Sequence, residues 1–217
     1  MLIRRSVLSI VAALAMLMPA TTATAAGPAS AAAAAKPMAT RVFHGTGDSV
    51  VRMGIGRHSV LVIVTASSPQ GLLVQPLSKG DVEGAYQVYE SHAYSGTTAL
   101  ISTPYSLAVT GFSIRTAGPW TIKIKPISAA PLWRKGTKTG HGDMVFRVYP
   151  AITKLTPARL VFSGAEIGNF IVTPYVRGVS RGSLVNFLGT HTNKRVLLPV
   201  GTDLVSVVAD GAWRLSR

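Results

Sequence analysis

The chain has 217 residues, no cysteine and a formal net charge of +14. Without cysteine it has no disulfide and no lipid-modified cysteine, so each domain has to be stabilised by its own apolar core. Only eight side chains are carboxylates. Acid–base glycosidase chemistry, which needs two carboxylates placed together, is therefore not expected.

The N-terminal residues are organised like a secretory signal peptide. A basic start over Met1–Arg5 precedes an apolar run over Val7–Met18, and Ala23-Thr24-Ala25 is a small-x-small cleavage site. The apolar run is shorter than the ~20 residues of a membrane-spanning helix. Residues 1–25 are therefore interpreted as a signal peptide cleaved near Ala25, and the mature protein as secreted, with no transmembrane segment. Arg4-Arg5 leaves twin-arginine export open beside the general route.

Residues 26–40 are rich in alanine and are predicted to form a disordered spacer. A helix over Ala31–Ala35 is conceivable, but Pro28 and Pro37 bracket it and it has no apolar face to bury.

The remainder of the chain is an internal repeat. Three stretches recur in the same order, at offsets of 95, 98 and 93 residues, and each recurrence has like residues in like places. The copies therefore differ by a three-residue insertion and a five-residue deletion, both in connections that tolerate length changes. We predict a first domain at 41–127, a linker at 128–138 and a second domain at 139–217. The matched pairs are Gly45–Met53 with Gly140–Val148, Leu72–Gly80 with Phe170–Gly178, and Gly118–Ile122 with Gly211–Leu215.

Short strands separated by turn residues fill both copies, and no stretch has sustained helical periodicity. Val60–Val64 is a continuous β-branched and aliphatic run, typical of a strand at the centre of a sandwich. Two weaker strands are expected between residues 82 and 101, with Tyr86, Val88 and Leu100 facing inward. Seven or eight strands in each copy predict an all-β protein of two tandem related β-sandwich, jelly-roll-like domains.

Pro76 and Pro174 occupy matched positions inside strand-like runs. Because proline has no N–H to donate to a neighbouring strand, we expect these two strands to be edge strands or to end there.

The order of these short motifs resembles a repeat found in actinobacterial secreted proteins and lipoproteins of unknown function. The second copy contains Asn169-Phe170-Ile171-Val172 and Leu184-Val185-Asn186, and the first contains Tyr94-Ser95-Gly96 and Gly118-Pro119-Trp120. The first copy departs from the pattern at Gly71-Leu72 and Tyr86-Gln87-Val88. The resemblance implies β-sandwich domains outside the cytoplasm, and it implies no activity and no catalytic residues.

Three tryptophans have to be assigned either to the core or to a binding surface. Trp120 and Trp213 begin strands whose next inward residues are aliphatic, which favours core anchors over platforms that stack on sugars. Trp133 has no counterpart in the repeat and is followed by Arg134 and Lys135. It is the better candidate for an exposed contact, although packing between the domains remains an alternative.

Titratable residues form no recognisable catalytic or metal motif. Asp48 and Asp143 are the only carboxylates that the copies share, and each is next to a glycine, which is typical of turn capping rather than of a calcium site. His58-Ser59 with Asp48 lacks the signature of a nucleophilic triad. We expect no catalytic residues, no metal and no cofactor.

The charge is the remaining functional signal. Without Arg4 and Arg5, twenty basic minus eight acidic side chains leaves +12. Such a chain would associate with anionic wall polymers or carbohydrate, although solubility alone would also explain the charge. Nucleic acid is not expected, because aromatic residues do not interleave the basic ones.

The predicted binding residues are Trp133, Arg134, Lys135 and Lys138. The predicted function is a non-catalytic envelope or extracellular binding module, with a secreted enzyme or enzyme inhibitor carrying a loop-borne site as the alternative. Ligand identity and oligomeric state stay open.

Overall fold

The computed structural model describes residues 38–217, and the dominant element of this part of the chain is the β-strand. The all-β prediction is confirmed. One 3₁₀ turn, η1 (Ile127–Ala129), interrupts the strands, and no helix between residues 38 and 217 is long and apolar enough to cross a membrane. The proposed signal peptide and most of the spacer lie outside the described residues. Met38 packs against the first core, so the unstructured spacer cannot extend to residue 40 as expected.

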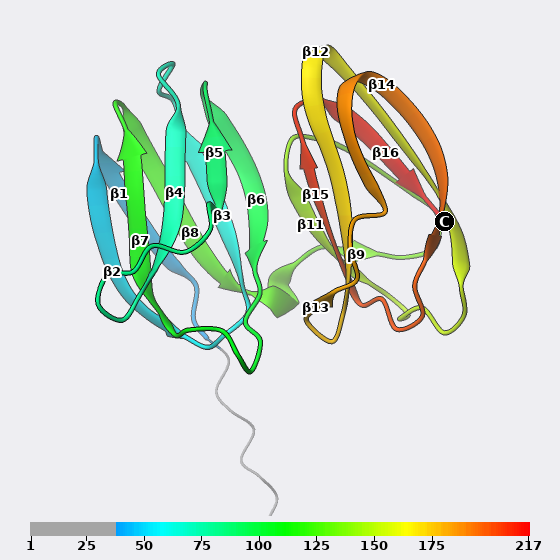
Figure 1. Ribbon diagram of the computed structural model, residues 1–217, viewed down its shortest axis with the longest axis horizontal. Helices are drawn as coiled ribbons and strands as arrows, with labels where there is room; N and C mark the ends of the chain where they lie inside the picture. The colour runs from blue at the N-terminus through cyan, green and yellow to red at the C-terminus, as the bar shows by residue number, and fades with distance from the viewer. Residues whose placement is uncertain (1–37) are drawn as a thin grey trace, which may run out of the picture. The chain divides into compact units, whose positions relative to one another are not determined.

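The first half of the chain forms a sandwich of two four-stranded sheets (Figure 1, blue to green). All strand pairs in it are antiparallel. One sheet has the order β1 (Arg41–Thr46), β8 (Pro119–Pro126), β3 (Val60–Ala66), β6 (Tyr94–Leu100). The other has the order β2 (Ser49–Gly56), β7 (Val109–Thr116), β4 (Leu72–Ser78), β5 (Val88–Glu90). This strand order is that of a jelly roll.

The second half repeats this order with longer strands. In Figure 1, β12 and β14 run side by side along the length of the sandwich. The N-terminal part of β12 pairs with β16 and its C-terminal part with β15. β10 pairs with β16 and β11 with β15, as β1 pairs with β8 and β2 with β7 in the first half, but here β12 joins all eight strands into one sheet. The strands are β10 (Thr137–His141), β11 (Met144–Val148), β12 (Thr156–Val176), β13 (Val179–Ser180), β14 (Val185–Leu198), β15 (Leu204–Ala209) and β16 (Ala212–Ser216).

One local sequence difference explains why β12 is continuous where β3 and β4 are separate strands. In the first half, Pro69 and Gly71 lie between the two strands, and Gly71 has a φ of 93°. A Cβ on Gly71 would lie 2.6 Å from the carbonyl oxygen of Glu90. The second half has no proline at this point, and a register shift between Ser163 and Gly168 bends the strand without ending it.

The residues predicted as a linker belong in part to the second sandwich. β9 (Leu132–Trp133) pairs in parallel with β11, and β10 begins at Thr137. The expected boundaries of 128–138 for the linker and 139 for the second domain are therefore wrong at this end. The reason is that Trp133 supplies a large apolar side chain to the second core.

Three expectations about individual strand positions are also corrected. Tyr86 does not face inward but is exposed and stacks on Tyr89, with 5.6 Å between ring centroids. Pro76 and Pro174 neither end their strands nor place them at a sheet edge. The carbonyl oxygens of both prolines still accept hydrogen bonds from a neighbouring loop, from the N–H of Gly84 and of Arg181.

The sandwich-centre prediction for Val60–Val64 is confirmed. Val60, Val62 and Val64 are fully buried in the first core, and Leu61, on the opposite face of β3, is buried in a smaller cluster with Val145 and Leu204 of the second half. This strand is covered on both faces, which is why its apolar run shows no alternation.

Candidate functional site

Trp120 and Trp213 are core anchors, as predicted. Their exposed fractions are 4% and 3%. Each indole N–H donates to a glycine carbonyl oxygen in a turn, Gly47 between β1 and β2 at 3.0 Å and Gly142 between β10 and β11 at 2.8 Å. Neither ring face is therefore available to stack on a sugar.

Trp133 is buried as well, so the expectation of an exposed contact is wrong. Only 1% of its surface is accessible. Its indole N–H donates to Gly136 O at 3.2 Å, and the guanidinium of Arg217 lies 5.4 Å from its ring centroid. The side chain closes one end of the second core.

The three basic residues predicted beside Trp133 lie at the edge of a sheet. Arg134 and Lys135 are exposed, and the Arg134 guanidinium lies over the ring of Tyr149. Lys138 is half-buried on edge strand β10, opposite Leu215. Because Leu215 is inward, Lys138 lies on the inner side of the sheet formed by β10, β16 and the adjoining parts of β12 and β14, whereas Arg134 and Lys135 lie in the loop between β9 and β10 at its edge.

The outer face of that sheet carries three further arginines, which we call the basic face: Arg159, Arg195 and Arg214. Arg159 and Arg195 are directly opposite each other on β12 and β14, and Arg214 is opposite Val161, two residues along β12. Side chains directly opposite, or two apart on one strand, share a face of the sheet. All three arginines are exposed, and the inward positions between them are Leu160, Phe162 and Leu215.

No carboxylate lies on the strand segments that carry the basic face. These four segments, residues 137–141, 156–163, 191–198 and 212–216, contain no aspartate or glutamate, and Glu166 lies further along β12. Across residues 38–217 the ion pairs are Arg52–Asp81 and Arg115–Glu83, both in the first sandwich. From residue 128 onward the chain has twelve basic and four acidic side chains, against seven and four between residues 38 and 127. The positive charge is therefore concentrated in the second sandwich.

A hollow of about 400 Å³ adjoins the basic face and is lined by Thr137, Arg159, Arg195 and Arg217, among others. It links the basic face to the predicted trio, since Gly136 and Thr137 lie between Lys135 and Lys138. Lys194-Arg195 is already visible in the sequence as a basic pair. Arg159 and Arg214 are not, because they are far apart in the chain and only strand register brings them together.

The carboxylates shared by the two copies make equivalent hydrogen bonds. Asp48 Oδ1 accepts from the N–H of Thr116, and Asp143 Oδ1 accepts from the N–H of Ala209, both at 2.9 Å. The two carboxylates therefore do not cap their own turns, contrary to the prediction, but accept from N–H groups in a distant strand. Asp143 makes one contact more, because its Oδ2 accepts from the hydroxyl of Tyr94 at 2.8 Å.

Glu90 lies near Asp143 and Asp210, and half-burial together with these two charges raises its pKa to about 7. Burial also raises the pKa of Asp143. No group of three or more potential metal ligands is arranged to hold an ion among residues 38–217.

The raised pKa of Glu90 predicts a pH-dependent stability. The folded state binds the Glu90 proton more tightly than the unfolded state does. The stabilisation of the folded state by this proton is therefore complete below about pH 4.5 and is lost as the pH rises through about 7. We expect a higher melting temperature at pH 5.5 than at pH 7.5, and a smaller difference in Glu90→Gln. Thermal melts across this range test it, with the exposed Glu166→Gln as control. Equal pH dependence in Glu90→Gln and wild type would contradict the assignment.

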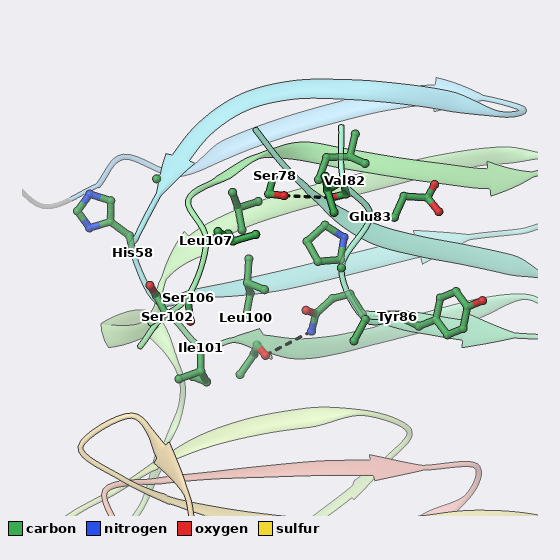
Figure 2. A pocket seen from close by; sticks show the side chains of 18 residues that line it. His58, Ser78, Val82, Glu83, Tyr86, Leu100, Ile101, Ser102, Ser106 and Leu107 are labelled. Carbon is green, nitrogen blue, oxygen red and sulfur yellow. Dashed lines mark hydrogen bonds between the residues drawn. The ribbon is translucent and has the colours of Figure 1, made fainter. Parts of the chain in front are cut away.

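The first sandwich has an apolar cleft of about 530 Å³ (Figure 2). It lies where the loop after β4 and the loop after β6 approach each other. His58 lies at one end, Glu83 and Tyr86 lie at the other, and Leu100 and Leu107 lie between them.

No family model and no curated protein matches this chain. Three proteins are among the solved structures that it resembles remotely. The regulatory subunit of a cAMP-independent protein kinase A from Trypanosoma brucei is 8% identical, with 82% of this chain and 73% of that chain covered and a TM-score of 0.22. The turret protein A223 of Sulfolobus turreted icosahedral virus is 12% identical, at 82% and 97% coverage and a TM-score of 0.23. The stem and receptor-binding domain of the spike protein P1 from bacteriophage PM2 is 8% identical, at 83% and 79% coverage and a TM-score of 0.19. At these TM-scores the likenesses bear on neither fold nor function, so the fold assignment rests on strand order alone.

Proposed function

We propose that this protein is a secreted, non-catalytic binding module for anionic cell-wall polymer, and that the basic face makes the contact. The observation that carries the proposal is the direct opposition of Arg159 and Arg195 on neighbouring strand segments that contain no carboxylate. Secretion itself rests on the sequence of residues 1–25.

Like charges directly opposite in an antiparallel pair cost stability rather than adding to it. The side chain of Asn193 only partly offsets this cost, by accepting from Arg159 Nε at 2.9 Å. The exposed pair of Arg159 and Arg195 costs stability in the free protein. A bound external anion would compensate the two positive charges and so explain why the pair is present. Guanidinium groups bind phosphate and carboxylate through two parallel hydrogen bonds, which suits them to this role.

The shape of the surface also favours a polymer over a small anion. The arginines lie on adjacent strands about 5 Å apart, and same-face residues along a strand are about 7 Å apart. Such a flat array presents charges at regular intervals to an extended chain. Binding would then release counterions from the polymer and weaken as salt rises.

Neutralising the basic face is expected to abolish most of the binding. Arg159→Gln, Arg195→Gln and Arg214→Gln together should weaken binding to a glycerol-phosphate polymer at least about tenfold and flatten the salt dependence. Stability should not fall, because the like-charge pair is removed. Calorimetric titration at several salt concentrations measures both effects.

Two matched variants share the same loss of three charges. Arg134→Gln, Lys135→Gln and Lys138→Gln should weaken binding less, because this trio only flanks the face. Arg41→Gln, Lys79→Gln and Lys123→Gln in the first sandwich should have little effect. If all three triple variants weaken binding equally, net charge and not the basic face is responsible, and tighter binding to DNA than to wall polymer would refute the proposed ligand.

A further inference from the structure

The cleft of the first sandwich is lined by a connection that is three residues longer than its counterpart in the second sandwich. The connection from β6 to β7 runs from residue 101 to 108 and supplies Ser106 and Leu107 to the cleft. Its counterpart between β14 and β15 is only Pro199–Asp203. That shorter connection is tied down, because Thr202 is fully buried and Gly201 N donates to Ile152 O.

The walls of the cleft are aliphatic, and most of its polar side chains are already paired within the protein. Ser78 donates to Val82 O, and Gln87 donates to Thr98 Oγ1 and Ala99 O. Ser106 Oγ accepts from the N–H of Thr103. A sugar or nucleotide needs several free donors and acceptors, so a wall with this pairing favours an apolar occupant.

The rim of the cleft exposes apolar side chains that a bound molecule would cover. Val82, Tyr86 and Leu107 are 56%, 62% and 65% exposed, and all three line the cleft. Clustering of exposed apolar side chains around one hollow marks a binding surface more often than scattered single residues do.

The two ends of the cleft differ in charge. At one end His58 follows Arg57 in an exposed turn, and neither is in an ion pair within residues 38–217. At the other end the carboxylate of Glu83 is held by Arg115 at 2.9 Å. An anionic group therefore fits the end at His58, which follows Arg57 in the chain, and an apolar tail fits the wall between Leu100 and Leu107 (Figure 2).

We propose that this cleft binds a single aliphatic chain that ends in a carboxylate, with the carboxylate at the end marked by His58, next to Arg57 in the chain, and the aliphatic chain between the loops after β4 and β6. The volume of about 530 Å³ is within the usual range for small-molecule sites. The site is independent of the basic face.

Titration of dodecanoate into the mature protein, residues 26–217, tests this proposal. Leu107→Glu should weaken dodecanoate binding at least about tenfold, because it places a charge where the alkyl chain lies. Leu188→Glu is the matched control, since Leu188 is 68% exposed on the second sandwich, and it should leave binding unchanged. If wild type does not bind dodecanoate, or if Leu107→Glu binds it as wild type does, the proposal is overturned.

The carboxylate end is tested separately. Wild type should prefer dodecanoate over dodecanol, and Arg57→Gln with His58→Gln should remove this preference while dodecanol still binds. An unchanged preference would overturn the assignment of the carboxylate end. The triple variant of the basic face should bind dodecanoate normally, so failure of the polymer experiment and failure of this one are distinguishable.

Discussion

Replacing Trp213 by alanine is expected to lower the free energy of unfolding by about 3–5 kcal/mol. The indole is buried in the second core, packs edge-to-face against Phe146 with 5.6 Å between ring centroids, and donates to Gly142 O. Trp120→Ala should cost a similar amount, because the same contact with Gly47 is made in the first sandwich. Chemical denaturation followed by circular dichroism measures both.

The glycine beneath each tryptophan provides a sharper test of the same packing. A Cβ on Gly140 would lie 2.3 Å from the Trp213 ring, and one on Gly45 would lie 2.3 Å from the Trp120 ring. Gly140→Ala should therefore destabilise strongly, whereas Gly54→Ala, where a Cβ would meet no atom within 4 Å, should not. Similar melting temperatures for the two alanine variants would contradict the packing of the ring on Gly140.

Asp143→Ala is expected to cost about 2–3 kcal/mol, because it leaves two hydrogen-bond donors without an acceptor. These are the N–H of Ala209 and the hydroxyl of Tyr94, and both bonds are buried. Asp48→Ala removes an exposed side chain that accepts from Thr116 N–H alone, so its expected cost is about 1 kcal/mol. The duplication thus provides its own control.

Two further variants separate the components of this effect. Tyr94→Phe removes one donor and leaves the Ala209 bond intact, so it should cost less than Asp143→Ala. Asp143→Asn keeps an acceptor and removes a charge whose burial is unfavourable at neutral pH, so its cost should be small. Equal destabilisation by Asp48→Ala and Asp143→Ala would show that the Tyr94 contact contributes nothing measurable.

Recognition of the basic face required strand register, whereas the predicted binding residues came from local sequence clusters. Arg134, Lys135 and Lys138 are prominent because they are close in the chain. Arg159, Arg195 and Arg214 are separated by 36 and 19 residues and become neighbours only through the pairing of β12 with β14 and β16. The burial of Trp133 also depends on a long-range contact. It follows from the parallel pairing of β9 with β11, which no local sequence pattern indicates.

The sequence by itself determined the all-β class and the burial of Trp120 and Trp213. These features depend on short-range patterns, namely alternation and a glycine before an aromatic anchor. Tertiary structure decided which charges share a face, that Trp133 is buried and that the longer connection after β6 lines a cleft. Those outcomes depend on contacts between residues far apart in the chain, and such contacts are set by sheet register and core packing rather than by any local preference.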